Sequence, residues 1–310
     1  MKLQTFPIMF FAVTMGLGGL GLAYMRVAEA IGAPSWSVSA VKIVASLVFA
    51  VILLAYLAKW ARYPAEVAAE LNHVIKINFF AAAPISMIIL SALWKSSPAL
   101  WGALFYGGGA ILTALTFYTI SFWINRNLEI KHSNPAWFIP IVGNLIVVAL
   151  GESGFWMWYY FAVGMFFYLI LFAIIFYRIL FHDQLAVKFM PTLFIMIAPP
   201  AIGFLGFLKL TGANELDAFS LCMLHLATFF ALLVAFMYKN FMKLKFFLSW
   251  WAFTFPTAAL SLAWYRAYEI AGNTAFLNIA VLAFAVLCMM IVFVGYHTIK
   301  NMLNGSICAE

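Results

Sequence analysis

Two glutamate–histidine pairs are the most chemically suggestive residues in this chain of 310. The pairs are Glu70 with His73 and Glu129 with His132, both spaced E-x-x-H. Di-iron carboxylate proteins place their ligands at this spacing on helices, but they need two further glutamates from facing helices. Glu66 is the only spare glutamate near either pair. We therefore expect no metal site, and we interpret both pairs as solvated charges in loops.

Other residue types that could do chemistry stand alone. Cys222, Cys288 and Cys308 have no paired spacing, so we expect neither a disulfide framework nor a metal centre. The glycines at 107–109 follow no strand and precede no Lys-Ser or Lys-Thr, which excludes a phosphate-binding loop. No catalytic triad falls within reach of one surface. The sequence therefore predicts no enzyme activity and no cofactor.

The composition explains why reactive residues are so sparse. Hydrophobic residues make up 67% of the chain, aromatic residues 18% and charged residues only 9%. A soluble domain carries about 25% charged residues. In water, this chain would expose far more apolar surface than a soluble protein tolerates. The composition thus excludes a soluble fold, a disordered chain, a nucleic-acid-binding domain and a secreted disulfide module, and indicates an integral membrane protein in contact with membrane lipids.

Ten runs without a charged residue mark the segments that must position any site. All but one reach the roughly 17 to 25 residues that a helix needs to cross the bilayer. The exception becomes long enough if Lys42 snorkels from a helix that begins near Trp36. The runs are apolar on all sides, unlike the alternating strands of a β-barrel. We predict an all-α protein with ten transmembrane helices in a single pore domain, residues 1–310. The runs are 3–25, 43–58, 77–94, 96–125, 132–151, 153–177, 189–208, 218–238, 246–265 and 270–299.

The basic residues predict the orientation. With the N-terminus inside, twelve Lys and Arg side chains face the cytoplasm and five face the other side. The positive-inside rule therefore places both termini in the cytoplasm of a multi-pass protein of the inner (plasma) membrane. The five on the outer side are Arg26, Lys42, Lys95, Lys209 and Arg266.

Prolines divide the predicted spans into two classes. They occur within spans 3, 5, 7 and 9 at steps of 56, 59 and 57 residues, and no even-numbered span has an interior proline. A period of one helical hairpin predicts five parallel repeats around an axis along the membrane normal. Because proline frees a carbonyl and bends a helix, we expect kinked odd-numbered helices to form a central pore inside a layer of unbroken even-numbered helices. The prolines are Pro84, Pro140, Pro199, Pro200 and Pro256. Span 1 has its proline only near its start, and there we expect the glycine cluster that begins at Gly16 to allow close approach to the neighbouring helices.

The lining of such a pore would carry no acidic group. Asp and Glu are absent from the span interiors, and His225 in span 8 is the only ionisable side chain deep in a span. We interpret His225 as a hydrogen-bonded packing residue of the outer layer. A narrow uncharged passage with positive charge at its cytoplasmic mouth would conduct small inorganic or organic anions. The candidate lining residues besides the prolines are Ser86, Gly143, Asn144, Gly203 and Thr254.

Four segments carry a resemblance to a known family: Ser249–Pro256 (SWWAFTFP), Pro191–Pro200 (PTLFIMIAPP), Pro135–Gly143 (PAWFIPIVG) and Phe11–Gly16 (FAVTMG). They resemble the tellurite-resistance and dicarboxylate transporter family, which includes the plant guard-cell slow anion channels. The match covers nearly the whole chain. The resemblance implies five hairpins around a central pore, a homotrimer with one pore per protomer, and a pore plug at Phe255, the residue before the proline of helix 9.

The residues alone do not single out Phe255, because Phe11 and Phe253 also lie in predicted inner helices. What distinguishes Phe255 is Pro256, which pushes the preceding residue away from helical geometry and can turn its side chain toward the axis. We therefore expect Phe255 to be the gate and Pro256 its kink.

Two functions follow, and the sequence leaves both open. The first is an anion channel with a narrow, uncharged pore plugged by Phe255. The alternative is a secondary transporter or exporter of dicarboxylate, sulfite or tellurite-type oxyanions, in one form coupled to protons through His225. The absence of carboxylates inside the spans favours the channel. The charge-free runs begin at residue 3 and end at residue 299, so we expect no regulatory tail of the plant type.

Overall fold

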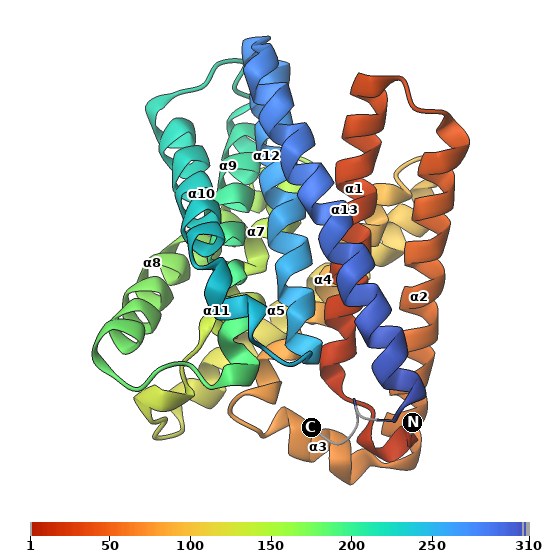
Figure 1. Cartoon of the computed structure of the whole chain (residues 1–310), viewed down its shortest axis with the longest axis vertical. Coiled ribbons are helices and arrows are strands. Elements are labelled where there is room, and N and C mark those ends of the chain that lie inside the picture. The colour runs from red at the N-terminus through yellow and green to blue at the C-terminus, as the bar shows by residue number, and fades with distance from the viewer. Residues whose placement is uncertain (1, 306, 308–310) are drawn as a thin grey trace.

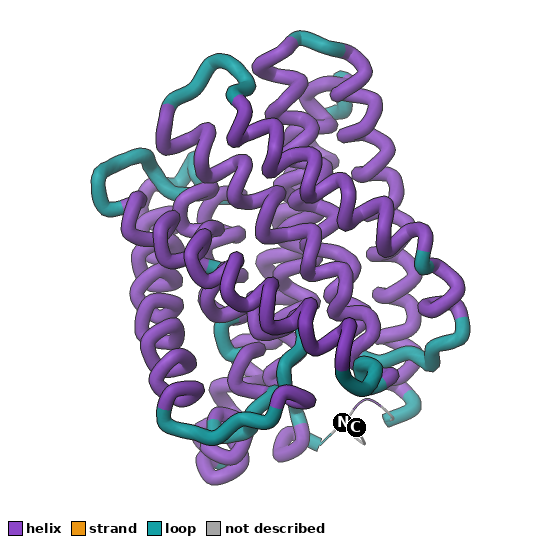
Figure 2. Tube along the Cα trace, turned by 90° about the vertical axis from the view of Figure 1, so that its left-hand side faces the viewer, coloured by secondary structure: helices purple, strands orange, loops and turns teal. Residues whose placement is uncertain are grey.

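The helices of this protein run side by side along one direction, and the loops gather at the two ends of the bundle (Figure 1, Figure 2). The structure is a computed structural model that describes residues 2–305 and 307, and within these residues it contains helices and no strand. The first 3-10 turn, η1 (Leu3–Thr5), and the last turns of α13 (Thr274–Leu303) lie at the same end (Figure 1).

Eight helical segments of the described chain are long and apolar enough to cross a membrane. The protein is therefore a multi-pass membrane protein. Some segments join a 3-10 turn to an α-helix, such as η2 (Ile8–Phe10) with α1 (Phe11–Ile31), and η3 (Lys76–Phe79) with α4 (Ala82–Leu93). Likewise η6 (Val187–Ile197) continues as α9 (Ala198–Thr211). The others are single helices: α2 (Ser35–Arg62), α5 (Pro98–Ile124), α8 (Met157–Phe181), α10 (Ala218–Phe236) and α13.

The predicted fifth and ninth spans are built differently and are not among these eight. The fifth is divided into η5 (Pro135–Trp137), α6 (Phe138–Val142) and α7 (Asn144–Leu150). The ninth consists of η7 (Leu248–Phe253) and α12 (Thr254–Ala271), and it carries several hydroxyl and charged side chains. By length and composition, the structure thus supports eight of the ten predicted spans. Two short helices, α3 (Pro64–Leu71) and α11 (Tyr238–Met242), lie between spans.

Buried and exposed segments alternate along the chain. In the membrane-spanning stretches that contain α1, α4 and α9, 67% to 72% of the residues are buried. In α2, α5, α8, α10 and α13 the buried share is 17% to 33%. The exposed side chains of these outer helices are mainly apolar, which suits a surface that faces lipid rather than water. The five segments that include α1, α4, α6 with α7, α9 and α12 form the inside of the bundle.

The prolines of the inner segments stand where a 3-10 helix passes into an α-helix. Each lies within the first three residues of its α-helix: Pro84 in α4, Pro140 in α6, Pro199 and Pro200 in α9, and Pro256 in α12. A backbone N–H has no partner within its own helix in this first turn, so its loss costs little. The prolines therefore begin the α-helical parts of the inner segments, whereas we had expected them to bend helices from within.

Candidate pore along the axis of the bundle

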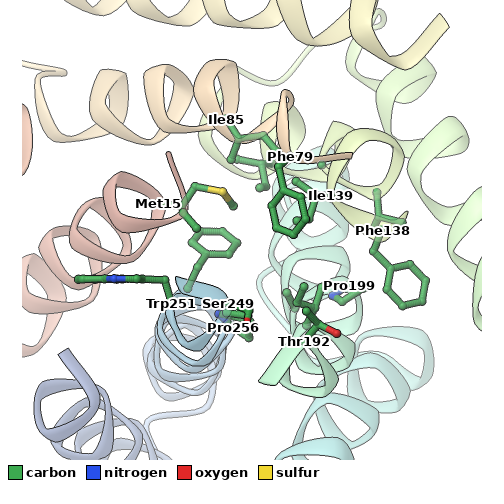
Figure 3. Close-up of a pocket in the computed structure, with 18 of the residues that line it drawn as sticks. Met15, Phe79, Ile85, Phe138, Ile139, Thr192, Pro199, Ser249, Trp251 and Pro256 are labelled. Carbon is green, nitrogen blue, oxygen red and sulfur yellow. The ribbon is translucent and has the colours of Figure 1, made fainter. Parts of the chain in front are cut away.

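A narrow apolar cavity lies between the five inner segments. Its volume is about 70 Å³, and no lining side chain is charged. Figure 3 shows Met15, Phe79 and Ile85 pointing into the opening between the helices. The cavity, called the inner cavity below, is lined by Met9, Ala12, Met15, Phe79, Ile85, Phe138, Ile139, Val142, Gly143, Ile146, Thr192, Ile195, Ala198, Pro199, Ile202, Leu248, Ser249, Trp251, Ala252, Phe255 and Pro256.

A wider cavity lies further along the same five segments. Its volume is about 450 Å³, and six of its lining side chains are charged. On every inner segment, the residues that line this second cavity follow those that line the inner cavity, so the two cavities are arranged one after the other along the bundle axis. This outer vestibule is lined by Leu22, Met25, Arg26, Glu29, Ala92, Lys95, Ala149, Leu150, Leu205, Lys209, Leu262, Tyr265, Arg266 and Glu269.

Phe255 and Pro256 are the last residues of the α12 segment that line the inner cavity on the way to the vestibule. The side chain of Phe255 is 9% exposed, and Leu262, about two helical turns further along α12, lines the vestibule. Gly19 on α1 faces the ring: a Cβ atom there would lie 3.2 Å from Cδ2 of Phe255 and 3.0 Å from the Cβ of Ala258. The glycine therefore lets α1 approach α12 closely beside the phenyl ring.

The other glycines of α1 produce the same close packing. A Cβ at Gly16 would collide with Thr254 and lie 2.9 Å from the Trp251 ring, both on the segment of α12. A Cβ at Gly18 would lie 2.6 Å from Ile89 on α4. Alternate glycines thus face α12 and α4, and they hold α1 tightly between these two helices.

Four of the predicted site residues line the inner cavity: Phe255, Pro256, Gly143 and Pro199. The remaining eight, Thr254, Gly16, Ser86, Pro84, Pro140, Asn144, Pro200 and Gly203, are absent from both linings. Gly203, for example, faces Met165 of α8, where an added Cβ would lie 3.3 Å from the sulfur. These eight residues lie on the inner segments, but on sides of the helices that line neither cavity.

The three polar residues expected in the lining instead make hydrogen bonds between and within helices. The hydroxyl of Ser86 lies 2.5 Å from that of Thr14 and joins α4 to α1. Asn144 Nδ2 donates to the Thr116 hydroxyl on α5 at 2.9 Å, and Thr254 donates to the carbonyl of Trp251 at 2.7 Å. Because these polar atoms have partners in the protein, the inner cavity keeps an apolar surface.

The charges of the vestibule were not foreseen as a group. Arg266 pairs with Glu269 at 3.0 Å, and Arg26 lies 3.7 Å from Glu269 and 3.8 Å from Glu29. The two lysines, Lys95 and Lys209, form no ion pair with any residue that the structure describes. The sequence does contain one indication that these charges lie together. Lys209 and Arg266 are 57 residues apart, which is one step of the proline repeat, so they occupy equivalent positions in neighbouring repeats.

Basic residues also gather at the starts of the inner segments, at the end of the bundle opposite the vestibule. Burial lowers the pKa of His73, and the nearby basic side chains of Lys76, Lys188 and His132 lower it further. The backbone N–H groups of Ile75 and Lys76 donate to Nδ1 of His73 at 3.1 and 3.3 Å. Residues that precede three different inner segments therefore bring positive charge to this end of the bundle.

Glu70 corrects one expectation about the E-x-x-H pairs. It lies on α3 with a buried side chain, and it accepts hydrogen bonds from Lys59 Nζ and the Tyr56 hydroxyl, both at 2.9 Å. Lys59 also donates to the carbonyl of Phe6 at 2.8 Å, so the pair ties the start of the chain to α2. Glu70 is thus a buried ion-pair residue, because Lys59 compensates its charge. The exposed Glu129 pairs with Lys131 at 2.6 Å.

Within residues 2–305 and 307, no three His, Cys, Asp or Glu side chains are close enough to hold a metal ion. Cys222 and Cys288 are free thiols, and Cys308 lies outside the described residues. His225 is exposed on α10, and its ring meets the edge of Trp264 at 5.9 Å between centroids. This aromatic contact replaces the hydrogen bond that we expected for His225.

Known proteins resemble the chain over most of its length. A family model described as "voltage-dependent anion channel" (SLAC1) matches residues 5–299. An uncharacterized transporter of Methanocaldococcus jannaschii is 26% identical over 298 residues, which cover 87% of each chain. The S-type anion channel SLAH3 of Arabidopsis thaliana is 27% identical over 290 residues, 88% of this chain but 44% of the plant protein.

A bacterial relative matches a shorter part. The tellurite resistance protein TehA homolog of Haemophilus influenzae is 28% identical over 139 residues, 44% of this chain and 42% of that protein. The resemblance seen in the proline-containing segments is therefore confirmed. Because the family model spans nearly all of the sequence, the chain belongs to the SLAC1 family of voltage-dependent anion channels.

Proposed function

We propose that this protein is an anion channel whose pathway runs through the outer vestibule and the inner cavity and is closed by Phe255. The observation that carries the proposal is the arrangement of the two cavities one after the other along the five inner segments. Phe255 lines the narrow cavity, and the wide one begins about two helical turns further along α12, at Leu262. A phenyl ring at this position would obstruct the passage of a hydrated ion.

The charge distribution supports an anion as the permeant species. The lining of the inner cavity has no carboxylate that would attract a cation. Positive side chains stand at both ends, with Lys76 and Lys188 at one mouth and Lys95 and Lys209 at the other. Such potentials concentrate anions at the entrances and repel cations, and selectivity then needs no tight site in the narrow part.

A secondary transporter of dicarboxylate, sulfite or tellurite-type oxyanions has less support. Proton coupling requires a titratable group that faces the transported ion. The inner cavity has none among its lining residues, and His225 is exposed on an outer helix. The vestibule carboxylates Glu29 and Glu269 are paired with arginines. Some relatives are named transporters, but that name describes movement of a solute without specifying coupling.

The membrane arrangement that goes with this function has ten spans. We infer that the divided fifth segment and the segment of α12 also cross the bilayer, since both line the two cavities together with three of the eight long spans. Both termini would then be cytoplasmic, in the inner (plasma) membrane, and residues 1–310 would form one pore domain. By family resemblance, we propose a homotrimer with one pore in each protomer. Cross-linking of the purified protein would give a trimer ladder, and a ladder that ends at two would contradict it.

The plug is tested by replacing Phe255 with alanine in protein reconstituted into planar bilayers. We expect the anion current to rise severalfold with selectivity over cations unchanged, since the ring is removed and the mouth charges remain. Phe253→Ala is the matched control, because Phe253 lies on the same segment but packs against Phe194 and Phe241 instead of lining the cavity. An unchanged current in Phe255→Ala, or a current carried by cations, would contradict the proposal.

A further inference from the structure

The outer vestibule contains more positive charge than its own carboxylates balance. Four basic and two acidic side chains line it, and they come from four of the five inner segments. The two carboxylates are both used by arginines, Glu29 by Arg26, and Glu269 by Arg26 and Arg266. Two positive charges are therefore left over among the lining residues.

The surplus belongs to Lys95 and Lys209. Neither lysine has an ion-pair partner within the described chain, and Lys209 Nζ donates only to the carbonyl of Ala149, at 3.3 Å. Lys95 is exposed and Lys209 is half-buried. Lys209 is close enough to Lys95 and Arg26, and to Glu152 just outside the lining, to interact with them electrostatically. Lysines brought together in this way repel each other unless an anion lies between them.

We propose that the outer vestibule binds a small divalent anion between Lys95 and Lys209. Its volume of about 450 Å³ accommodates an oxyanion the size of sulfate together with part of its water shell. Two ammonium groups offer up to five N–H donors for the oxygens of the anion, since Lys209 gives one to Ala149. The inner cavity, at about 70 Å³ and without a charged side chain, offers no comparable place.

The same geometry predicts a preference for two charges over one. Each lysine attracts a dianion about twice as strongly as a monoanion at the same distance, because the Coulomb energy scales with the product of the charges. An anion of charge minus two also neutralises both lysines, whereas one chloride leaves a net positive charge. We therefore expect sulfate to bind more tightly than chloride.

This inference rests on the proposed function in one respect, namely that the vestibule is the outer entrance of the channel. A dianion held there would stand in the path of monovalent ions but would be too strongly hydrated to enter the apolar inner cavity. Sulfate on the outer side should therefore reduce the chloride current of Phe255→Ala channels, while sulfate on the cytoplasmic side should have less effect.

Binding is measured by calorimetry on the purified protein, with sulfate titrated at constant ionic strength. We expect Lys95→Gln and Lys209→Gln each to weaken sulfate binding by about tenfold, and the double variant to lose it. The matched control is Lys42→Gln, which removes a cation at the same end of the bundle whose ammonium lies 3.7 Å from the centroid of the Trp94 ring. Glu29→Gln should strengthen binding, because it removes one of the two carboxylates that lie near Arg26.

Two results would contradict the proposed anion site in the vestibule. These are equal affinities for sulfate and chloride in the unchanged protein, or a loss of sulfate affinity in Lys42→Gln as large as that in Lys95→Gln. Because calorimetry requires no current, it tests the site even where Phe255→Ala fails to conduct. A binding site without channel activity would contradict the proposed function and leave the vestibule site standing, whereas current without sulfate binding would do the reverse.

Discussion

The inner cavity and the outer vestibule are formed by the same five segments, yet only the vestibule has charged side chains in its lining. The inner cavity has a volume of about 70 Å³ and no charged lining residue, whereas the vestibule has about 450 Å³ and six. Width explains the difference. A charged side chain in a narrow apolar space loses its water and is costly, while the same side chain in a wide, wet space keeps its hydration.

A carboxylate placed in the inner cavity should produce the largest effect. Ile202 is 7% exposed and lines this cavity on α9. In channels opened by Phe255→Ala, we expect Ile202→Asp to reduce the anion current at least tenfold and to shift the reversal potential toward cation permeation. The physical reason is that an unpaired charge acts strongly on a nearby ion where water is scarce.

Ile202→Asn separates this electrostatic effect from a change of shape, since the amide is nearly isosteric with the carboxylate but uncharged. We expect it to keep most of the anion current. Equal losses in Ile202→Asp and Ile202→Asn would show that packing, and not charge, decides conduction at this position.

Removing one negative charge from the vestibule should change the anion current less than adding one to the inner cavity does, and should raise the current instead of lowering it. Glu269→Gln removes the carboxylate that neutralises Arg266 and, in part, Arg26. We expect the anion current at low salt to increase about two- to threefold, and the increase to vanish near 1 M salt, where the Debye length is about 3 Å. Recordings over a series of chloride concentrations give this measurement.

Glu215→Gln is the control for Glu269→Gln. Glu215 is exposed in the loop between α9 and α10, on the same side of the protein, and it is not part of the vestibule lining. An equal increase in both variants would mean that the general surface charge acts on the current and that the vestibule has no special role.

The sequence was sufficient for the features that depend on one segment at a time. The apolar runs predicted where helices lie, and SWWAFTFP with the other proline segments led to the correct family. Gly143, Pro199, Phe255 and Pro256 were placed on the segments that line the inner cavity. Each of these inferences needs only local composition, spacing or a contiguous motif.

The features that depend on several segments at once were missed. Arg26, Lys95, Lys209 and Arg266 looked like four separate span ends, and their convergence needs the packing of helices far apart in sequence. The burial of Glu70 has the same origin, since its partner Lys59 is on another helix. Asn144 and Ser86 were assigned to the pore because an unpartnered polar side chain in a span suggests a wet surface, but Thr116 and Thr14 supply their partners.

The smallest expected effect concerns His73, which lies at the end of the bundle opposite the vestibule. His73 has a pKa below its ordinary value, chiefly because of burial and also because of nearby cations. Its Nδ1 accepts two backbone N–H groups, so a proton on that atom would break both hydrogen bonds at the entry to η3, which leads to the cavity residue Phe79.

The sign of the pH dependence follows from this shift. The unfolded chain has an ordinary histidine pKa of about 6.5 and therefore binds more protons than the folded chain just below that pH. The stability that His73 contributes is thus present above about pH 6.5 and is lost as the pH falls through the lower pKa of the folded state. Thermal unfolding in detergent should show a slightly larger decrease in melting temperature between pH 7.5 and pH 5 for the unchanged protein than for His73→Gln. Identical slopes would mean that neither burial nor the neighbouring basic residues lower the pKa of His73 in the folded protein.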